Sequence, residues 1–478
     1  MRSKIIKLAM LSVLAVGTFA TTSCVDETLN EDPKHASVLP SENVLGVSLY
    51  QYSYYVVNPS VNFNNYNFFV QQWAETTYTD ETNYNLVTRN QPRNHFNRMY
   101  VYAIGNIKNA KAALATEGNS EAVQKNKAAT LEILEVLTWE NVVNTYGNVP
   151  YSEAFKGNSD RNYNPKYDDA KEIYADLIRR LNEVITTIDT SEDGYTNGDF
   201  AYYGNMDGWK KTANSIKLRL GINLADSDAA LAKSTIESAV QSGVYTSDAD
   251  SFTFAFDGGT FSNPVFDNLV ASGRNDFVPS ELIINTMKAS SDPRLASWFT
   301  TVNGEYVGGV FGALNPFNSR SHLSTAFFLQ PNGAEKLLSF TEISFILAEA
   351  AARGFSVGGS AQSYYDQAIT ASMAESNVSD ADAATYLAAN PYNAANWKKS
   401  IGEQAWVSLF NRAYAAWNFT RRLDYPVLVN PVNSLTETVP FRMPYSDQEY
   451  VLNKTNVEAA ASAIGGDNVS TKLFWDIF

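Results

Sequence analysis

Apolar residues recur at mixed three- and four-residue spacing through most of the chain, and this spacing predicts amphipathic helices. In the stretch 120–146 the apolar positions are Val123, Leu131, Leu134, Leu137, Val142 and Tyr146. Asp169, followed three residues later by Glu172, is typical of the first turn of a helix. The apolar stripe of that helix is Ile173, Leu177, Leu181, Val184 and Ile188. Further helices are predicted at 207–226, 229–242, 280–289, 339–353, 360–376 and 399–421.

Long stretches without a helical period separate these helices. They are rich in Asn, Gly, Pro, Tyr and Phe, and they cover 58–93, 244–279, 300–335 and 424–455. Phe252, Phe254 and Phe256 alternate with smaller residues, which is the period of a strand. Connections this long in a compact protein are usually functional. The pattern therefore predicts a mostly α protein with long irregular loops and a few short strands.

The beginning of the chain has the pattern of a secretory signal. Three cations in residues 1–7 precede an apolar run at 8–20, and small residues then lead to Cys24, the single cysteine of the chain. The apolar run is well short of the roughly 20 residues that span a bilayer. We therefore expect a signal peptide at 1–23, lipidation of Cys24, an acidic tether at 24–37 and one domain at 38–478.

The net charge of the chain argues against some classes of binding partner. The net charge is −15, and removal of the signal peptide with its three cations leaves −18. A strongly acidic surface repels phosphate groups, which argues against nucleic acid and against adsorption to anionic lipid. The chain has 27 Tyr, 26 Phe and 8 Trp. This is more ring surface than a core of this size usually uses, so we expect part of it to face a ligand.

Known catalytic and metal-binding motifs have little support. Gly354, Ser356 and Gly358 have the spacing of a nucleophile elbow, but that elbow follows a strand and needs a histidine partner. The residues before Gly354 are predicted to be helical, so this glycine is expected to end a helix. The histidines are His35, His95 and His322. They give no zinc-ligand spacing with Cys24, and no phosphate-cradling or dinucleotide motif is present, so we expect no metal and no cofactor.

Acidic residues leave one enzymatic alternative open. Glycosidases need only two carboxyl groups at a suitable separation, and the chain has 51 acidic residues from which the sequence nominates no pair. Glu132 and Glu135 share one helix face, and we expect that face to be solvated.

Several segments in order along the chain resemble the SusD/RagB family of outer-membrane nutrient-binding lipoproteins. In sequence letters they are YGNVPYSEA at 146–154, PKYD at 165–168, IYADL at 173–177, WKKTANSIKLRL at 209–220, FTEISFILAEA at 340–350, QAWVSLF at 404–410, AWNFTRR at 416–422 and PFRMPY at 440–445. Each match alone is weak, but their shared order makes the resemblance specific. Residues 55–100 match the family poorly, which leaves the ligand-facing surface open.

The resemblance implies both an architecture and a role. The fold would be a right-handed superhelix of about four tetratricopeptide-like helix pairs. The partner would be a SusC-like, TonB-dependent outer-membrane barrel, which receives a glycan or peptide from this non-catalytic lipoprotein. Acidic residues just after Cys24 resemble surface-export signals, so we expect the protein on the outer face of the outer membrane. These residues are Asp26, Glu27, Glu31 and Asp32.

Loop aromatics are the expected ligand-binding residues, because neutral ligands are held by ring stacking and a few directed hydrogen bonds. The stretch 73–89 supplies Trp73, Tyr78, Asp80, Tyr84, Asn85 and Arg89. We expect Trp73, Tyr78 and Tyr84 to form a stacking platform. A second stretch, 306–320, supplies Phe311, Phe317, Asn318 and Arg320.

Other conspicuous residues are interpreted as structural. Trp209, Trp406 and Trp417 stand at helical spacing and are expected in the core. Arg421 and Arg422 are expected to bond the last carbonyl groups of their own helix.

Two other classes of protein remain as alternatives. One is a lipid-anchored surface glycoside hydrolase, and the other is a structural or adhesive surface protein. The sequence leaves the choice between glycan and peptide open.

Overall fold

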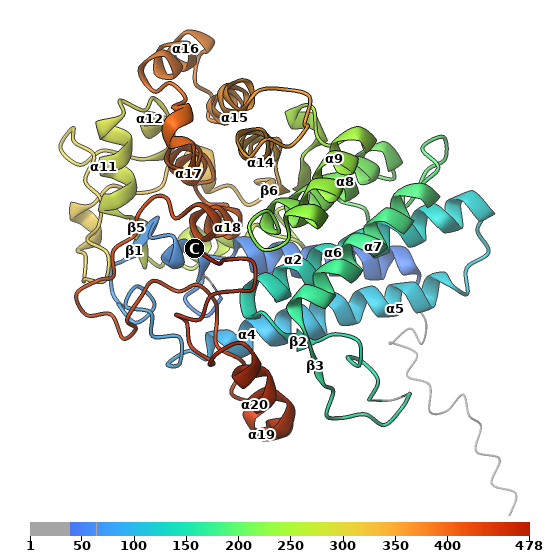
Figure 1. Cartoon of the computed structure of the whole chain (residues 1–478). Helices are drawn as coiled ribbons and strands as arrows, with labels where there is room; N and C mark the ends of the chain where they lie inside the picture. Colours follow the sequence, from blue (N-terminus) through green and yellow to red (C-terminus); the bar gives the residue numbers. More distant parts are fainter. Residues whose placement is uncertain (1–38, 64, 158) are drawn as a thin grey trace, which may run out of the picture. The chain divides into compact units, whose positions relative to one another are not determined.

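Pairs of helices packed against each other form the framework of the structure (Figure 1). In this computed structural model, residues 39–63, 65–157 and 159–478 are described. The pairs are α2 (Ser41–Val57) with α5 (Gly105–Leu114), α6 (Glu121–Tyr146) with α7 (Ala170–Thr187), α8 (Met206–Asn223) with α9 (Ala229–Ser242), and α14 (Phe340–Ala352) with α15 (Ala361–Glu375). The predicted mostly α fold of helix pairs is confirmed. The predicted signal peptide, Cys24 and the tether lie outside the described residues.

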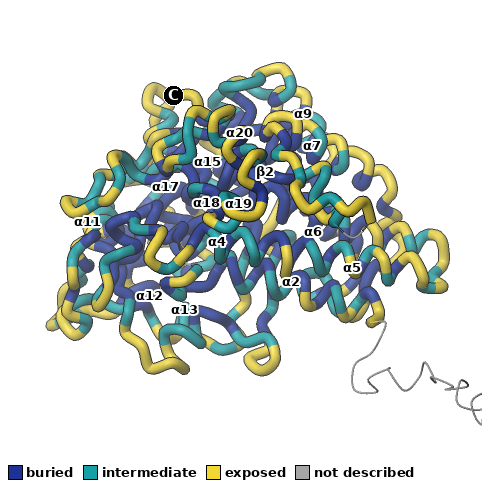
Figure 2. Tube along the Cα trace, turned by 90° about the horizontal axis from the view of Figure 1, so that it is seen from below, coloured by how far each residue is buried: buried dark blue, intermediate teal, exposed yellow. Residues whose placement is uncertain are grey.

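Successive pairs stack on one another, so one hydrophobic core runs through Ser41–Phe478. Helix α5 packs on α6, α7 on α8, and α8 on α14. Beyond them, α14 also packs on α17 (Trp397–Ser408), which in turn contacts α18 (Ala413–Leu423). Helix α18 is buried over almost its whole length (Figure 2). Trp209, Trp406 and Trp417 are buried as predicted.

Local sequence signals place most of the predicted helices correctly. The Asp169 side chain accepts a hydrogen bond from the backbone N–H of Lys171 at 2.8 Å and caps α7. Such a cap stabilises a helix by about 1 kcal/mol. Helix α9 has the predicted bounds, and α14 ends beside Gly354, which has the positive φ of 87° that glycine allows at a helix end. The nucleophile-elbow spacing is therefore a helix terminus.

One long helix predicted at 399–421 is wrong, because the structure breaks it into α17 and α18. Asn411 lies between them with a φ of 62°, a left-handed conformation that ends a right-handed helix. Helix α2 was not predicted. Its buried positions include Ser48, Ser53 and Tyr52, so burial does not follow a simple apolar stripe.

Three short antiparallel strand pairs tie the loops together. They are β1 (Trp73–Glu75) with β5 (Phe277–Pro279), β2 (Val149–Pro150) with β3 (Tyr167–Asp168), and β4 (Phe252–Phe254) with β6 (Glu335–Leu338). The strand predicted from the alternating phenylalanines is confirmed at β4.

The remaining elements are short segments and peripheral helices. Between the first pair lie α3 (Tyr66–Phe69), α4 (Gln91–Asn97) and η2 (Arg98–Ile104). The middle of the chain adds η3 (Asp248–Asp250), α10 (Pro264–Phe266), η4 (Asp267–Ala271), α11 (Glu281–Ala289), α12 (Arg294–Trp298), η5 (Phe317–Ser319) and α13 (Thr325–Phe328). The last part adds α16 (Asp380–Ala389), η6 (Ala394–Asn396), α19 (Glu449–Leu452) and α20 (Lys454–Ala463). None of the helices within these described ranges is long and apolar enough to cross a bilayer.

Buried charges correct two predictions. Glu135 is not solvated: its carboxylate lies 2.5 Å from Lys111 Nζ and 3.3 Å from Arg180. Arg421 and Arg422 do not bond their own last carbonyls. Because the end of α18 is buried, Arg421 reaches the backbone oxygen of Asn144 at 2.7 Å, and Arg422 pairs with Glu349 of α14.

Candidate functional site

The two loop stretches proposed from the sequence lie against each other. Asn315 donates a hydrogen bond from Nδ2 to the backbone oxygen of Glu75 at 2.9 Å, and Asn83 donates to that of Gly312 at 3.0 Å. Strand β5 joins them by pairing with β1. The cluster formed by residues 71–91, 274–280, 306–323 and 428–437 is called the loop cluster below.

A third contribution comes from the C-terminal loop, which sequence reasoning missed. Gln71 donates from Nε2 to the backbone oxygen of Val429 at 2.8 Å. The backbone N–H of Leu435 donates to the backbone oxygen of Asn83 at 3.0 Å. No residue type at 428–437 signals this contact, because it consists of backbone atoms meeting a distant loop.

Two buried glutamates, Glu75 and Glu81, adjoin at the base of the loop cluster. Glu75 and Glu81 are both buried, and Thr82 donates to Glu75 Oε2 from its backbone N–H (3.0 Å) and its hydroxyl (2.8 Å). Glu75 Oε1 and Glu81 Oε2 are buried with no other donor. Burial, with the adjoining Glu81 carboxyl, raises the pKa of Glu75 to about 9. Glu75 is therefore protonated at neutral pH and donates to Glu81.

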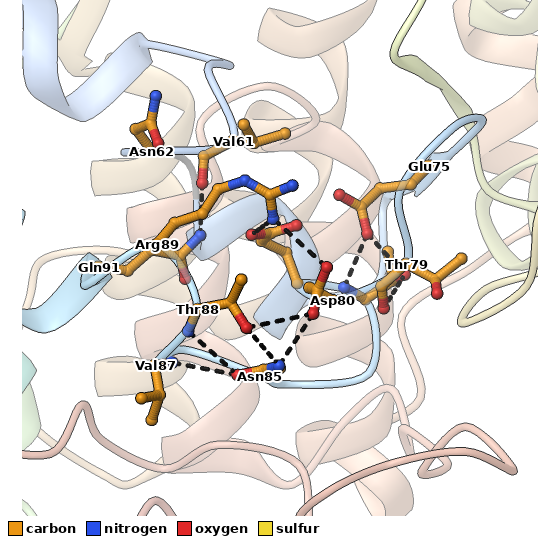
Figure 3. Close-up of polar contacts among 12 residues, drawn as sticks. Val61, Asn62, Glu75, Thr79, Asp80, Asn85, Val87, Thr88, Arg89 and Gln91 are labelled. Carbon is orange, nitrogen blue, oxygen red and sulfur yellow. Dashed lines mark hydrogen bonds and ion pairs between the residues drawn. The ribbon is translucent and has the colours of Figure 1, made fainter.

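Polar side chains around this pair fix the shape of the 75–91 loop (Figure 3). Arg89 forms an ion pair with Glu81 and lies 3.6 Å from the Asp80 carboxylate. Asn85 donates from Nδ2 to Asp80 at 2.9 Å and to the Thr88 hydroxyl at 2.7 Å. The structure thus brings together Asp80, Asn85 and Arg89, three of the residues predicted to bind ligand, and much of their hydrogen-bonding capacity holds the loop.

The predicted three-ring platform is wrong. Trp73 is only 1% exposed and Tyr84 only 2%. The cause is the pairing of β1 with β5, which buries Trp73 beside Phe277 at 5.7 Å between ring centroids. The Tyr84 hydroxyl accepts a hydrogen bond from Gln71 at 2.8 Å, and its ring lies 6.0 Å from that of Phe311.

Tyr78 is the ring of the predicted platform that remains on the surface. It is 40% exposed, and the Arg89 guanidinium carbon lies 4.8 Å from its ring centroid. Such a cation–π contact holds the ring in place without covering it completely. At the other end of the loop cluster, Phe317 stacks on His322 at 3.8 Å, and Arg320 Nε donates to Asn315 at 3.2 Å.

A pocket of about 470 Å³ adjoins the loop cluster. Tyr84, Asn85 and Val87 line one side, and Leu435 and Thr436 line another. Its volume lies in the range of about 300–1,000 Å³ that small-molecule pockets occupy. Apolar and amide groups are joined there by the acidic side chains of Glu437 and Asp467, and this mixture of acceptors and apolar surface suits a hydroxyl-bearing ligand without negative charge.

Histidine and acidic side chains do not gather into a metal centre within the described ranges, where no three His, Cys, Asp or Glu groups could hold an ion. His95 is buried among the hydroxyls of Tyr66 and Tyr146 and the amide oxygen of Asn141. Burial lowers its pKa to about 4, so the imidazole is neutral and part of the core.

Stacked helix pairs that carry a rigid loop cluster beside a pocket define the class of the protein: a helical-repeat binding protein. The family model described as "Starch-binding associating with outer membrane", SusD-like, matches residues 33–446. The chain therefore belongs to the SusD-like family, as the sequence resemblance predicted.

Solved structures agree with this assignment. A chitin-binding protein is 26% identical, with a TM-score of 0.81 over 92% of this chain and 100% of its own. A SusD homolog from Bacteroides uniformis is also 26% identical, with a TM-score of 0.79 over 91% and 99% of the two chains. A chitin-binding SusD homolog from Flavobacterium johnsoniae is 24% identical, with a TM-score of 0.76 over 92% and 97%, and shows the shared fold. No curated protein matches the chain.

Proposed function

We propose that this protein is a cell-surface lipoprotein that binds a glycan through the loop cluster and passes it to a SusC-like, TonB-dependent outer-membrane barrel. The family description and the chitin-binding relative favour a glycan over the peptide that the sequence left open. The observation that carries the proposal is the exposed Tyr78 ring, held by Arg89 on the same 75–91 loop whose residues Tyr84, Asn85 and Val87 line the 470 Å³ pocket. Lipidation of Cys24 would hold the protein at the membrane.

The arrangement of the loop cluster favours binding over hydrolysis. Glycosidase carboxyl pairs stand about 5–10 Å apart around the bond that they cleave. Glu75 and Glu81 instead share a hydrogen bond, are buried, and are held by Thr82 and Arg89. This pair therefore supports the loop, and the protein is proposed to act without catalysis.

Glycan binding is tested by isothermal titration calorimetry of the mature, non-lipidated protein with chitin and starch oligosaccharides. Tyr78→Ala should weaken binding about fivefold, because it removes a stacking contact worth about 1 kcal/mol. Tyr163→Ala, which changes a more exposed ring outside the loop cluster, is the control and should bind as the wild type does. Equal affinities for wild type and Tyr78→Ala would contradict the proposed site.

Delivery is tested separately by affinity purification of the tagged, lipidated protein from detergent-solubilised outer membranes. A TonB-dependent barrel in stoichiometric amount is the expected result. Recovery of the protein alone would contradict the transport role and would leave the glycan-binding result untouched.

A further inference from the structure

A second pocket, of about 440 Å³, shares no residue with the loop cluster. It lies between α12 and α13, which pack against each other, strand β6, the end of α15 and the connection from α17 to α18. Asp248 of η3 completes the lining, so six segments from the second half of the chain meet around one hollow. It is called the second pocket below.

One wall of the second pocket is aromatic. Trp298 and Phe410 stack nearly parallel, with ring centroids 5.3 Å apart and an interplanar angle of 18°. The Phe328 ring stands edge-on to Phe410 at 5.5 Å, and Phe327 stands edge-on to Phe328 at 4.7 Å. Trp298 and Phe410 are buried, whereas Phe327 and Phe328 are half-buried and present ring surface to an occupant.

The facing wall holds an acceptor with spare capacity. Asn263 donates from Nδ2 to Glu335 Oε1 at 3.1 Å, and Oε2 has no hydrogen bond within the described residues. Glu335 is half-buried in the pocket lining. Burial raises its pKa to about 7, so the carboxyl is about half ionised at neutral pH and accepts hydrogen bonds through its free oxygen.

A donor with spare capacity lies near this acceptor. Arg412 forms an ion pair with Glu375 through Nη2, while its Nη1 is buried without a hydrogen-bond partner. An unpaired buried donor of this kind is destabilising unless a ligand satisfies it. The two cations of the lining, Lys336 and Arg412, are both paired, because Lys336 Nζ binds Asp248 and lies 3.3 Å from the Glu375 carboxylate that Arg412 also binds.

We propose that the second pocket binds a neutral saccharide unit, with sugar hydroxyls donating to Glu335 and accepting from Arg412 and one sugar face packed on Phe327 and Phe328. Both cations of the lining are paired with carboxylates, which argues against an amino acid or another zwitterion, because its carboxylate would need an unpaired cation. The site goes beyond glycan capture at the loop cluster, because it would hold a mono- or disaccharide independently.

The test is saturation-transfer NMR on the mature, non-lipidated protein with glucose, galactose and N-acetylglucosamine, and with glycine as the zwitterionic probe. All measurements are made in a Tyr78→Ala background, which weakens the loop cluster. At least one sugar should bind with a Kd in the millimolar range, as expected for a ligand of about 12 heavy atoms. Glycine should not bind.

Two variants report on the two walls. Glu335→Gln keeps the bond from Asn263 but turns the free acceptor into a donor, and it should weaken sugar binding at least tenfold. Phe327→Ala should weaken it by a similar factor through lost ring contact. The matched controls are Glu458→Gln on α20 and Phe355→Ala, a half-buried ring outside both sites, and these should bind as the background does.

Three outcomes would overturn the proposal: no sugar binds, glycine binds in place of sugar, or both pocket variants bind as their controls do. Thermal melting of each variant shows whether it is folded, and Glu335→Gln tests the proposal even if Phe327→Ala unfolds. Failure here leaves oligosaccharide binding at the loop cluster intact, because that site is measured with Tyr78 present and Glu335 unchanged.

Discussion

The proton shared by Glu75 and Glu81 makes the stability of the protein depend on pH in a direction opposite to that of most carboxylates. The pKa of Glu75 is about 9 in the folded protein, against an ordinary value of 4.5. Below pH 4.5 the side chain is protonated in both the folded and the unfolded state. Between pH 4.5 and 9 the folded state retains the proton that the unfolded state has lost. The free energy of unfolding therefore falls as pH rises through this range.

The magnitude follows from the same linkage. Each pH unit inside that window lowers the free energy of unfolding by about 1.4 kcal/mol. Glu75→Gln resembles the protonated acid: its amide nitrogen can donate to Glu81, and its oxygen can accept from Thr82. The substitution removes the cost of taking up a proton and should stabilise the protein by on the order of 2–3 kcal/mol at pH 7.

Urea unfolding followed by tryptophan fluorescence, at intervals from pH 5 to pH 9, measures this difference. The advantage of Glu75→Gln over wild type should grow with pH, while Glu458→Gln, an exposed substitution on α20, should follow wild type throughout. A constant difference between Glu75→Gln and wild type across this range would refute the shared proton. So would a Glu75→Gln variant that is less stable than wild type at pH 8.

Two further predictions concern the core and the anchor. Arg219 lies 2.7 Å from Glu140 and 3.2 Å from Glu342, and all three side chains are buried. Arg219→Ala should therefore lower the free energy of unfolding by about 3–5 kcal/mol, because it leaves two buried carboxylates without their cation. Arg179→Ala, at an exposed ion pair, should cost less than about 1 kcal/mol in the same urea experiment, and equal losses would contradict the argument. Cys24→Ser should abolish incorporation of radiolabelled palmitate and release the protein from the membrane fraction; retained label would exclude Cys24 as the lipidation site.

Sequence signals predicted the helices correctly where neighbouring residues alone determine the helix. Helix α9 and the capped start of α7 follow from periodicity and from a side chain that bonds its own helix terminus. The signal at Asn411 was missed because one left-handed residue interrupts an otherwise continuous apolar period. Helix α2 was not predicted, because serines and tyrosines fill several of its buried positions and obscure the apolar period.

In the candidate site, residue composition did not indicate which aromatic rings are buried and which are exposed. The stretches 73–89 and 306–320 were named as separate candidates, and neither their contact nor the burial of the rings within them followed from composition. Trp73 and Tyr78 are both aromatic residues of one loop, and only the pairing of β1 with β5 buries the first. Burial depends on which distant segment covers a residue, and that segment leaves no mark on the sequence nearby.

The helical character and the family could be predicted from the amino-acid sequence, because periodicity and the order of motifs are properties of neighbouring residues. The contact of Glu75 with Glu81, the approach of the C-terminal loop to the loop cluster, and the placement of Glu335 and Arg412 around one pocket became visible in the three-dimensional structure. Each of these depends on contacts between residues whose distance in space is set by how the helix pairs stack.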